Sequence, residues 1–440
     1  MKIRGLLIAI VILAALAGTL YWSNHHQPAT TTEASTPAAP KILSLKEDDI
    51  TKVQIKKKDA PDVVLSKDNG GKWQITAPQQ LPAEQASVSP VLSTLSSLNS
   101  DRLVEEKASD LSPYGLAQPA LEAVVSEKNS QSQTLLLGDS TPTGNAVYAK
   151  LESDPRIFTI YSYAKTSLDK SVNDLRDKRL LTVDSEKISK IELSAKKQNI
   201  EFGRSKDGWQ IVKPQPARAD GFQVDDLVRT LTDARMDLSA SDDSKKLASA
   251  FASGMPVATA KVTDSSGTQQ IEVRKNKDDY YAKSSVVAGA FKVPSSLGTG
   301  LDKGFEDFRN KKLFDFGFND PNKIEIHGGT KSYFLTRNGA DWWNGNGQKM
   351  DVSAVSGLLE KVRDLAATKF PDKGFTNPDV TLIVTSDDGK RTEKVLISKN
   401  GENYTAKREN EPELYQLDSK AVQDLQKAAE EVKPAPPPKK

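Results

Sequence analysis

The sequence predicts an α+β fold of three tandem similar modules behind an N-terminal membrane helix, each module a mostly antiparallel β-sheet with packed helices. Three observations support this prediction. A tryptophan recurs at Trp73, Trp209 and Trp342. Around each tryptophan, the apolar residues change from a spacing of two, typical of strands, to the spacing of a helix. An apolar run occupies residues 6–22 near the start of the chain.

The composition excludes several classes of function. At about 150 residues per domain, the 440 residues suggest roughly three domains. The 61 Lys and Arg against 59 Asp and Glu argue against a nucleic-acid partner. The chain has no cysteine, which excludes disulfides and catalytic or metal-binding thiolates. Of its three histidines, only His327 lies beyond the N-terminal region. We therefore predict no catalytic, cofactor-binding or metal-ligating residues.

The N-terminal run predicts a location. Lys2 and Arg4 precede it, and no Lys or Arg follows until Lys41, which indicates a cytoplasmic N-terminus and an exported remainder. As a helix, residues 6–22 are about 26 Å long, close to the thickness of a bilayer core. An uncleaved single-pass anchor in the inner membrane (residues 1–22) is favoured, with the bulk of the chain periplasmic. The alternative is a signal peptide cleaved after residues 15–17.

Two segments are predicted to lack a packed core. Residues 23–41 consist mainly of Thr, Ala, Pro and Ser without apolar periodicity, so we interpret them as a flexible stalk. His25 and His26 lie in this stalk, and a solvated pair is favoured over a metal site. Residues 434–440 form a Pro- and Lys-rich tail, interpreted as a spacer.

Between these segments lie the modules, predicted at residues 42–184, 185–319 and 320–433. Alternating apolar residues predict two strands ahead of each tryptophan: 50–55 and 63–65, 188–193 and 200–202, and 324–326 and 333–335. Apolar residues at helical spacing then predict helices over 88–98, 224–231 and 352–365. Further strands follow, and Asp387–Lys390 carries an Asp-Gly pair that predicts a hairpin.

The first two modules end in similar basic stretches, 175–181 and 308–314, which are 133 residues apart. A motif found only between modules indicates a structural joint with apolar residues docked and basic residues solvated or paired. The third module ends at residues 425–432 without an equivalent. Here the chain resembles the family DUF4340, on Gly208-Trp209 with Pro214, on residues 175–181, and on the strand 188–193. The resemblance implies a membrane-anchored extracytoplasmic protein, often encoded beside ABC transporters of the gliding-motility type, with no established catalytic residues.

Two sets of residues form a candidate interaction surface. The basic residues Arg176, Arg179, Arg309 and Lys312 have the charge to bind phosphate or lipid headgroups. Trp343 and Asn344 have the chemistry of a sugar-binding patch, whereas Trp73, Trp209 and one of the pair at 342–343 are expected in the core. Each set also has a structural interpretation: the basic stretches as joints between modules, and the tryptophans as core residues.

The sequence therefore favours a non-catalytic, membrane-anchored extracytoplasmic interaction protein that serves an ABC transporter or a cell-envelope complex. One alternative is a cell-wall glycan-binding protein that uses exposed aromatics such as Trp343. The other is a carboxylate-based hydrolase, because the paired carboxylates of such enzymes are brought together by the fold and leave no spacing motif.

Overall fold

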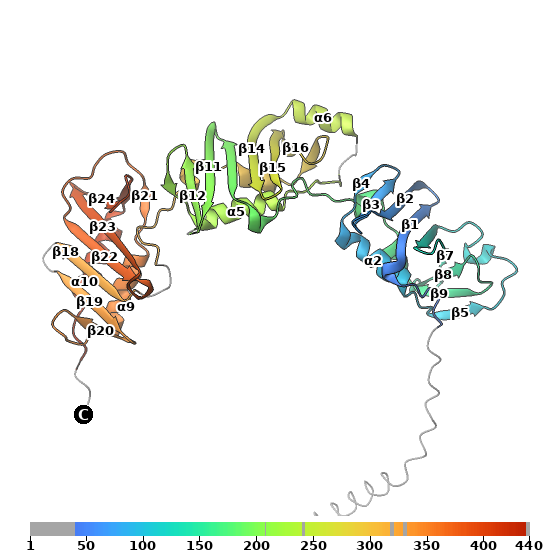
Figure 1. Ribbon diagram of the computed structural model, residues 1–440, viewed down its shortest axis with the longest axis horizontal. Helices are drawn as coiled ribbons and strands as arrows, with labels where there is room; N and C mark the ends of the chain where they lie inside the picture. Colours follow the sequence, from blue (N-terminus) through green and yellow to red (C-terminus); the bar gives the residue numbers. More distant parts are fainter. Residues whose placement is uncertain (1–39, 207, 240–242, 317–320, 329–331, 437–440) are drawn as a thin grey trace, which may run out of the picture. The chain divides into compact units, whose positions relative to one another are not determined.

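The computed structural model describes residues 40–206, 208–239, 243–316, 321–328 and 332–436 (Figure 1). Within these ranges the chain forms three antiparallel sheets with helices packed against them, which confirms the predicted α+β class. The chain divides into two compact units, residues 1–178 with the first sheet and residues 179–440 with the other two. No helix in the described ranges is long and apolar enough to cross a membrane, and the predicted anchor (1–22) lies outside them.

The first sheet has nine strands in the order β4-β3-β2-β1-β6-β7-β8-β9-β5. In the sequence, α2 connects the two edge strands, β4 and β5, and α3 and α4 follow β9. The strands are β1 (Ile50–Lys57), β2 (Ala60–Lys67), β3 (Trp73–Ala77), β4 (Leu81–Pro82), β5 (Arg102–Glu105), β6 (Leu121–Glu127), β7 (Ser132–Ser140), β8 (Ala146–Leu151) and β9 (Ile157–Tyr161), and the helices are α2 (Gln85–Ser96), α3 (Ser162–Leu168) and α4 (Val172–Leu175).

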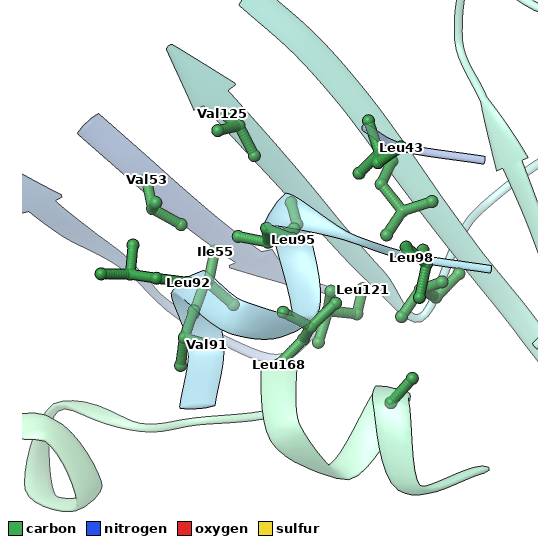
Figure 2. Packing of buried hydrophobic residues seen from close by; sticks show 14 of the residues in the cluster. Leu43, Val53, Ile55, Val91, Leu92, Leu95, Leu98, Leu121, Val125 and Leu168 are labelled. Carbon is green, nitrogen blue, oxygen red and sulfur yellow. The ribbon is translucent and has the colours of Figure 1, made fainter. Parts of the chain in front are cut away.

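The core of the first module shows how the periodicities produce the fold. Every second residue of β1 faces inward, so Val53 and Ile55 are fully buried. Val91, Leu92 and Leu95 lie on one stripe of α2 and pack onto these strand residues (Figure 2). Each such burial contributes roughly 2 kcal/mol.

The second sheet has eight strands in the order β13-β12-β11-β10-β14-β15-β16-β17. The third sheet follows the order β20-β19-β18-β22-β23-β24-β25-β21. The second comprises β10 (Lys190–Ala195), β11 (Gln198–Ser205), β12 (Gly208–Lys213), β13 (Ala217–Arg218), β14 (Met255–Asp264), β15 (Gly267–Asn276), β16 (Asp279–Ser284) and β17 (Phe291–Val293), with helices α5 (Gly221–Thr232), α6 (Ser244–Ala252), α7 (Ser295–Leu301) and α8 (Phe305–Phe308). The third comprises β18 (Lys323–Gly328), β19 (Tyr333–Asn338), β20 (Asp341–Asn344), β21 (Ala367–Lys369), β22 (Val380–Ser386), β23 (Arg391–Asn400), β24 (Asn403–Arg408) and β25 (Leu414–Leu417), with helices α9 (Val352–Arg363) and α10 (Ser419–Glu431).

The three sheets share the order of their central strands. In each, the first strand (β1, β10 or β18) lies between its own hairpin partner (β2, β11 or β19) and the first strand of the later meander (β6, β14 or β22). The predicted helices over 88–98, 224–231 and 352–365 correspond to α2, α5 and α9. The Asp387–Lys390 turn joins β22 to β23 as a hairpin, with Asp387 and Asp388 at positive φ. Trp73, Trp209 and Trp342 are buried in the three cores, as expected.

The basic stretches divide between neighbouring cores. Leu175 belongs to the first core, whereas Leu180 and Leu181 belong to the second, ahead of the boundary predicted at 184. Likewise, Phe308 lies in the second core and Leu313 in the third. Each stretch therefore closes one module and opens the next.

The same backbone bonds recur at all three modules. Leu175, Phe308 and Lys433 each accept a hydrogen bond from the residue before the long helix, at 2.8, 2.8 and 2.9 Å. At the other end of that helix, the amides of Ile42, Leu180 and Leu313 donate to the carbonyl oxygens of Leu98, Ala234 and Leu365. The start of the first module, at Ile42, therefore makes only the second of these two bonds. The end of the third module, at Lys433, makes only the first.

Backbone pairing also extends across two of the predicted boundaries. The third module has a backbone equivalent of the joint. Pro434 forms an isolated antiparallel β-bridge with Met350, and the amide of Ala435 donates to the carbonyl oxygen of Lys349 at 2.9 Å. The tail predicted from residue 434 therefore begins inside the module. The predicted stalk also ends earlier than residue 41, since Lys41 bridges Asn99. Sequence identity is lost at these terminal positions, but backbone pairing requires no particular side chain.

Candidate functional site

The connection from the second to the third module is surrounded by charged side chains. Arg309, which follows α8, is only 6% exposed. Its Nη1 lies 3.0 Å from Glu306 Oε1 and its Nη2 lies 2.9 Å from Glu413 Oε1. The guanidinium carbon lies 3.4 Å from the centroid of the Phe370 ring, within the range of a cation–π contact. Arg309 is therefore fixed on three sides.

Glu413 has the opposite charge but a similar environment. Its side chain is 8% exposed. Burial raises the pKa of Glu413 above its usual value, although Arg309 acts in the opposite direction. The neighbouring Tyr415 is fully buried, and its hydroxyl donates to Glu411 Oε2 at 2.7 Å. Burial, with Glu411 as a further cause, raises the pKa of Tyr415, so this hydroxyl keeps its proton.

A second part of the network is centred on Asp315, in the segment that enters the third module. Its amide donates to Glu393 Oε1 at 3.0 Å, and its carboxylate lies 3.2 Å from Arg391 and forms an ion pair with Arg218. Arg408 joins the two parts, because its Nη2 lies 3.1 Å from Glu393 and its Nε donates to Glu411 at 2.7 Å.

The network links the two modules of the second unit. Arg218 on β13 and Arg309 after α8 come from the second module. Their partners Glu411 and Glu413 come from the segment between β24 and β25 of the third. Buried pairs of this kind add little net stability compared with apolar contacts, but removing one partner is costly, so they fix how the two surfaces meet.

A surface cleft of about 300 Å³ adjoins the network. Its walls come from the start of α5 and from residues 310–315. Asp220 caps α5 by accepting from the amides of Phe222 and Gln223 at 3.0 and 3.3 Å, and this cap leaves the Phe222 side chain outside the helix core. Phe222 is 84% exposed, and Asp225 and Lys312 also line the cleft.

The four predicted basic residues differ in how deeply the structure buries them. Arg309 is buried and paired, so it does not belong to an exposed surface. Lys312 is exposed on the cleft, and its carbonyl oxygen accepts a bond from Arg218 Nη1 at 2.8 Å. In the first connection, Arg176 is half-buried and its backbone forms an isolated antiparallel β-bridge with Ala83. Arg179 is exposed, and its backbone forms such a bridge with Arg235. Only Arg309 and Lys312 thus come together at the junction of the second and third modules.

The predicted aromatic patch lies at the edge of the third sheet. Trp343 is half-buried and faces Thr336 across the β19–β20 hairpin. The Asn344 side chain is used within the turn, because its Oδ1 accepts from the amides of Asn346 and Gln348 at 3.0 and 2.9 Å. Asn344 therefore shapes the hairpin.

Sequence reasoning missed most of the network. Arg218, Asp315, Glu393, Arg408 and Glu413 belong to no recurring motif. The signal that would have found them is a charge that appears in one module at a position where another has a neutral residue. Phe222 shows the same kind of signal, since the corresponding position after the helix cap is Ser353 in the third module. No group of three or more His, Asp or Glu within the described ranges is arranged to hold a metal ion.

A family model described as a domain of unknown function, DUF4340, matches residues 73–211 and again residues 209–381. The chain belongs to this family. The two matches together span both connections between modules, and each runs from one buried tryptophan to the next module. Each match therefore begins within one sheet and ends within the next, and it includes the joint between them. Comparison with curated proteins gives no match.

Proposed function

We propose that this DUF4340 chain is a non-catalytic, membrane-anchored extracytoplasmic interaction protein that serves as an accessory of an ABC transporter or another cell-envelope complex. The observation that carries the proposal is Phe222, an aromatic side chain 84% exposed beside a cleft of about 300 Å³. Aromatic side chains, phenylalanine among them, are enriched at the buried centres of protein interfaces. Asp225 and Lys312 flank it with both charges, which suits a polar rim.

The network beneath the cleft supports an interaction role. Asp315 lines the cleft and also pairs with Arg218 and Arg391. A partner that docks on Phe222 therefore meets a surface whose walls are held by partly exposed ion pairs. Such preorganisation lowers the entropy lost on binding. The transporter as partner is supported by the family resemblance alone.

Site-specific photo-crosslinking tests the proposal. A photoreactive phenylalanine analogue replaces Phe222 in the full chain, and crosslinks are formed in native membranes. Met255, 71% exposed, is the matched control because it is a large apolar side chain on the same unit that does not line the cleft. We expect a transporter or envelope subunit to be captured from position 222 and not from position 255. Capture of no envelope protein at position 222, or of the same proteins from both, would contradict the proposal.

The anchor is tested separately. Residues 6–22 are proposed to stay in the inner membrane with the N-terminus in the cytoplasm. Washing membranes with alkaline carbonate is expected to leave the chain in the pellet. Release into the supernatant would remove the anchor from the proposal while leaving the interaction surface in place.

One observation favours a glycan-binding alternative. Phe334 is 41% exposed and lies two residues before Thr336 on β19, on the same face as Trp343. An aromatic pair on one face of a hairpin can stack against sugar rings. Oligosaccharides from peptidoglycan should then shift the tryptophan fluorescence of the wild-type chain, and the shift should vanish in Trp343→Ala. An unchanged spectrum rules against this alternative.

A further inference from the structure

A pocket of about 200 Å³ lies in the third module between the sheet and α10. Its inner wall is aliphatic, formed by strand residues such as Ile326, Leu382 and Ile397 and by Leu425 and Ala429 of α10. Gln426 and Glu430, both exposed, mark where it opens to solvent. The pocket is separate from the cleft at Phe222.

The second module fills the corresponding place with its own chain. There α7 ends at Leu301, the chain turns, and α8 inserts Phe305, which is 8% exposed. The Phe305 amide donates at 2.8 Å to the side chain of Gln198, at the hairpin turn between β10 and β11. In the third module α10 continues without a break from Ser419 to Glu431 and presents the small Ala429 instead.

The position relative to the hairpin shows that the two places correspond. Leu193 pairs with Ile200 in the second module, and Ile326 pairs with Tyr333 in the third. Ile326 and Tyr333 line the pocket, at the same end of the sheet as the turn that Phe305 covers. At this end of the sheet the second module therefore contributes Phe305 to its core, whereas the third module has Ala429 and the pocket.

One polar group of the pocket wall has no partner within the described part of the chain. The hydroxyl of Tyr333 is buried without a hydrogen-bond partner among the described residues, and such a group is costly unless something binds it. Glu430 places a negative charge near the same opening and disfavours an anionic group there. An engineered apolar cavity of about 150 Å³ binds benzene, so this pocket accommodates a group of about seven carbons.

We propose that the pocket binds a small amphiphile with an aliphatic body of about seven carbons and a neutral or cationic head group that forms a hydrogen bond with the Tyr333 hydroxyl. The aliphatic body contacts Ile326, Leu382, Ile397 and Ala429. The head group lies toward Gln426 and Glu430. This combination of an apolar wall with one or two polar groups is typical of small-molecule sites.

The test is a titration of the full chain in lipid nanodiscs, with labelled Ile, Leu and Val methyl groups observed by NMR. The probes are heptylamine, heptanol and heptanoate. We expect heptylamine and heptanol to shift the methyl signals of Ile326, Leu382 and Ile397, and heptanoate to bind at least tenfold more weakly. Equal binding of heptanoate, or shifts confined to other methyl groups, would overturn the proposal.

Two variants separate pocket binding from partition into the lipid. Ala429→Phe imitates the second module and should weaken heptylamine binding at least tenfold while the chain stays folded. Gln423→Phe adds the same ring at an exposed position of α10 and should leave binding unchanged. Tyr333→Phe should weaken heptanol binding roughly fivefold by removing one hydrogen bond. Undiminished binding in Ala429→Phe contradicts the proposal.

Discussion

The segments that enter the second and third modules have the same backbone connection but different side chains around it. At the second module the amide of Thr182 donates to Gln269 Oε1 at 2.8 Å, and the hydroxyl of Ser284 donates to the carbonyl oxygen of Leu180. At the third, the amide of Asp315 donates to Glu393, and Arg408 donates to the carbonyl oxygen of Leu313. Neutral groups in one module are thus replaced by charged groups in the other.

The strand registers show that these positions correspond. Val262 pairs with Gln269 as Val384 pairs with Glu393, and Ile271 pairs with Ser284 as Val395 pairs with Arg408. The list of replacements is therefore Thr182 by Asp315, Gln269 by Glu393 and Ser284 by Arg408. The neutral set forms hydrogen bonds with the backbone of the segment that enters the second module. The charged set forms the equivalent bonds at the third module, and its Asp315 also forms an ion pair with Arg218 of the preceding module. Pro82 occupies the position of Arg218 in the first module.

The largest effect is expected from Arg309→Ala. The substitution leaves Glu413 buried without its cation, which costs about 3 kcal/mol of unfolding free energy. Lys312→Ala, four residues from the same helix but exposed, is the control and should change stability by less than about 0.5 kcal/mol. Denaturant unfolding of the full chain measures both. Equal effects of the two variants would show that the buried pair does not hold the junction.

The second-largest change in unfolding free energy is expected when the charged residues of the third module are replaced by their neutral counterparts from the second. Arg408→Ser alone removes the nearest cation of Glu393 and Glu411, which keep only the longer pairs to Arg391 and Arg218 at 3.5 and 3.8 Å, and should cost about 2 kcal/mol. Adding Asp315→Thr and Glu393→Gln recreates the arrangement of the second module. We expect the triple variant to recover at least about 1 kcal/mol of this loss, because pairs and networks are not additive. A triple variant less stable than the single one would show that the two connections are not interchangeable.

A smaller effect is expected from shortening the C-terminus. A chain that ends at Val432 loses the bonds from Asp351 to Lys433 and from Ala435 to Lys349, which together contribute about 1–2 kcal/mol. A chain that ends at residue 436 keeps both and should match the full chain. Thermal unfolding of the two truncated chains distinguishes them. Identical midpoints would mean that the third module does not need its half of the joint.

The smallest effect is a pH dependence of opposite sign at the two connections. Ser266 and the amide of Asp184 lower the pKa of Asp264 to about 2, so its stabilisation is present above pH 3.8 and is lost as the pH falls toward 2. Burial raises the pKa of Glu413, so its contribution is complete below pH 4.5 and is lost as the pH rises. Asp264→Asn should flatten the acid side of the stability profile, and Glu413→Gln the side above pH 4.5. An unchanged profile in either variant contradicts that assignment.

Much of the fold followed from periodicity. Val53 and Ile55 alternate along β1, and Val91 and Leu95 fall on one face of α2, because these spacings are set by strand and helix geometry. The joint was also visible, since Leu175 and Phe308 recur at one offset. The half-joint at Lys433 was not, because it is formed by backbone atoms.

The candidate site was less predictable for two physical reasons. The burial of Arg309 depends on Phe370 and Glu413, which lie far from it in the sequence. The exposure of Phe222 depends on the cap at Asp220, which starts α5 ahead of the apolar run that begins at Val224. Pairings across such distances are created by the tertiary fold, and a search for recurring motifs passes over residues that occur in one module only.

We expect the charged network to make the second and third modules one cooperative unit. Hydrogen exchange of the full chain, followed by mass spectrometry at increasing denaturant, tests this most directly. The amides of β14 and β22 should lose protection at the same denaturant concentration in the wild-type chain and at different concentrations in Arg309→Ala. Separate loss of protection in the wild-type chain, or joint loss in the variant, would contradict it.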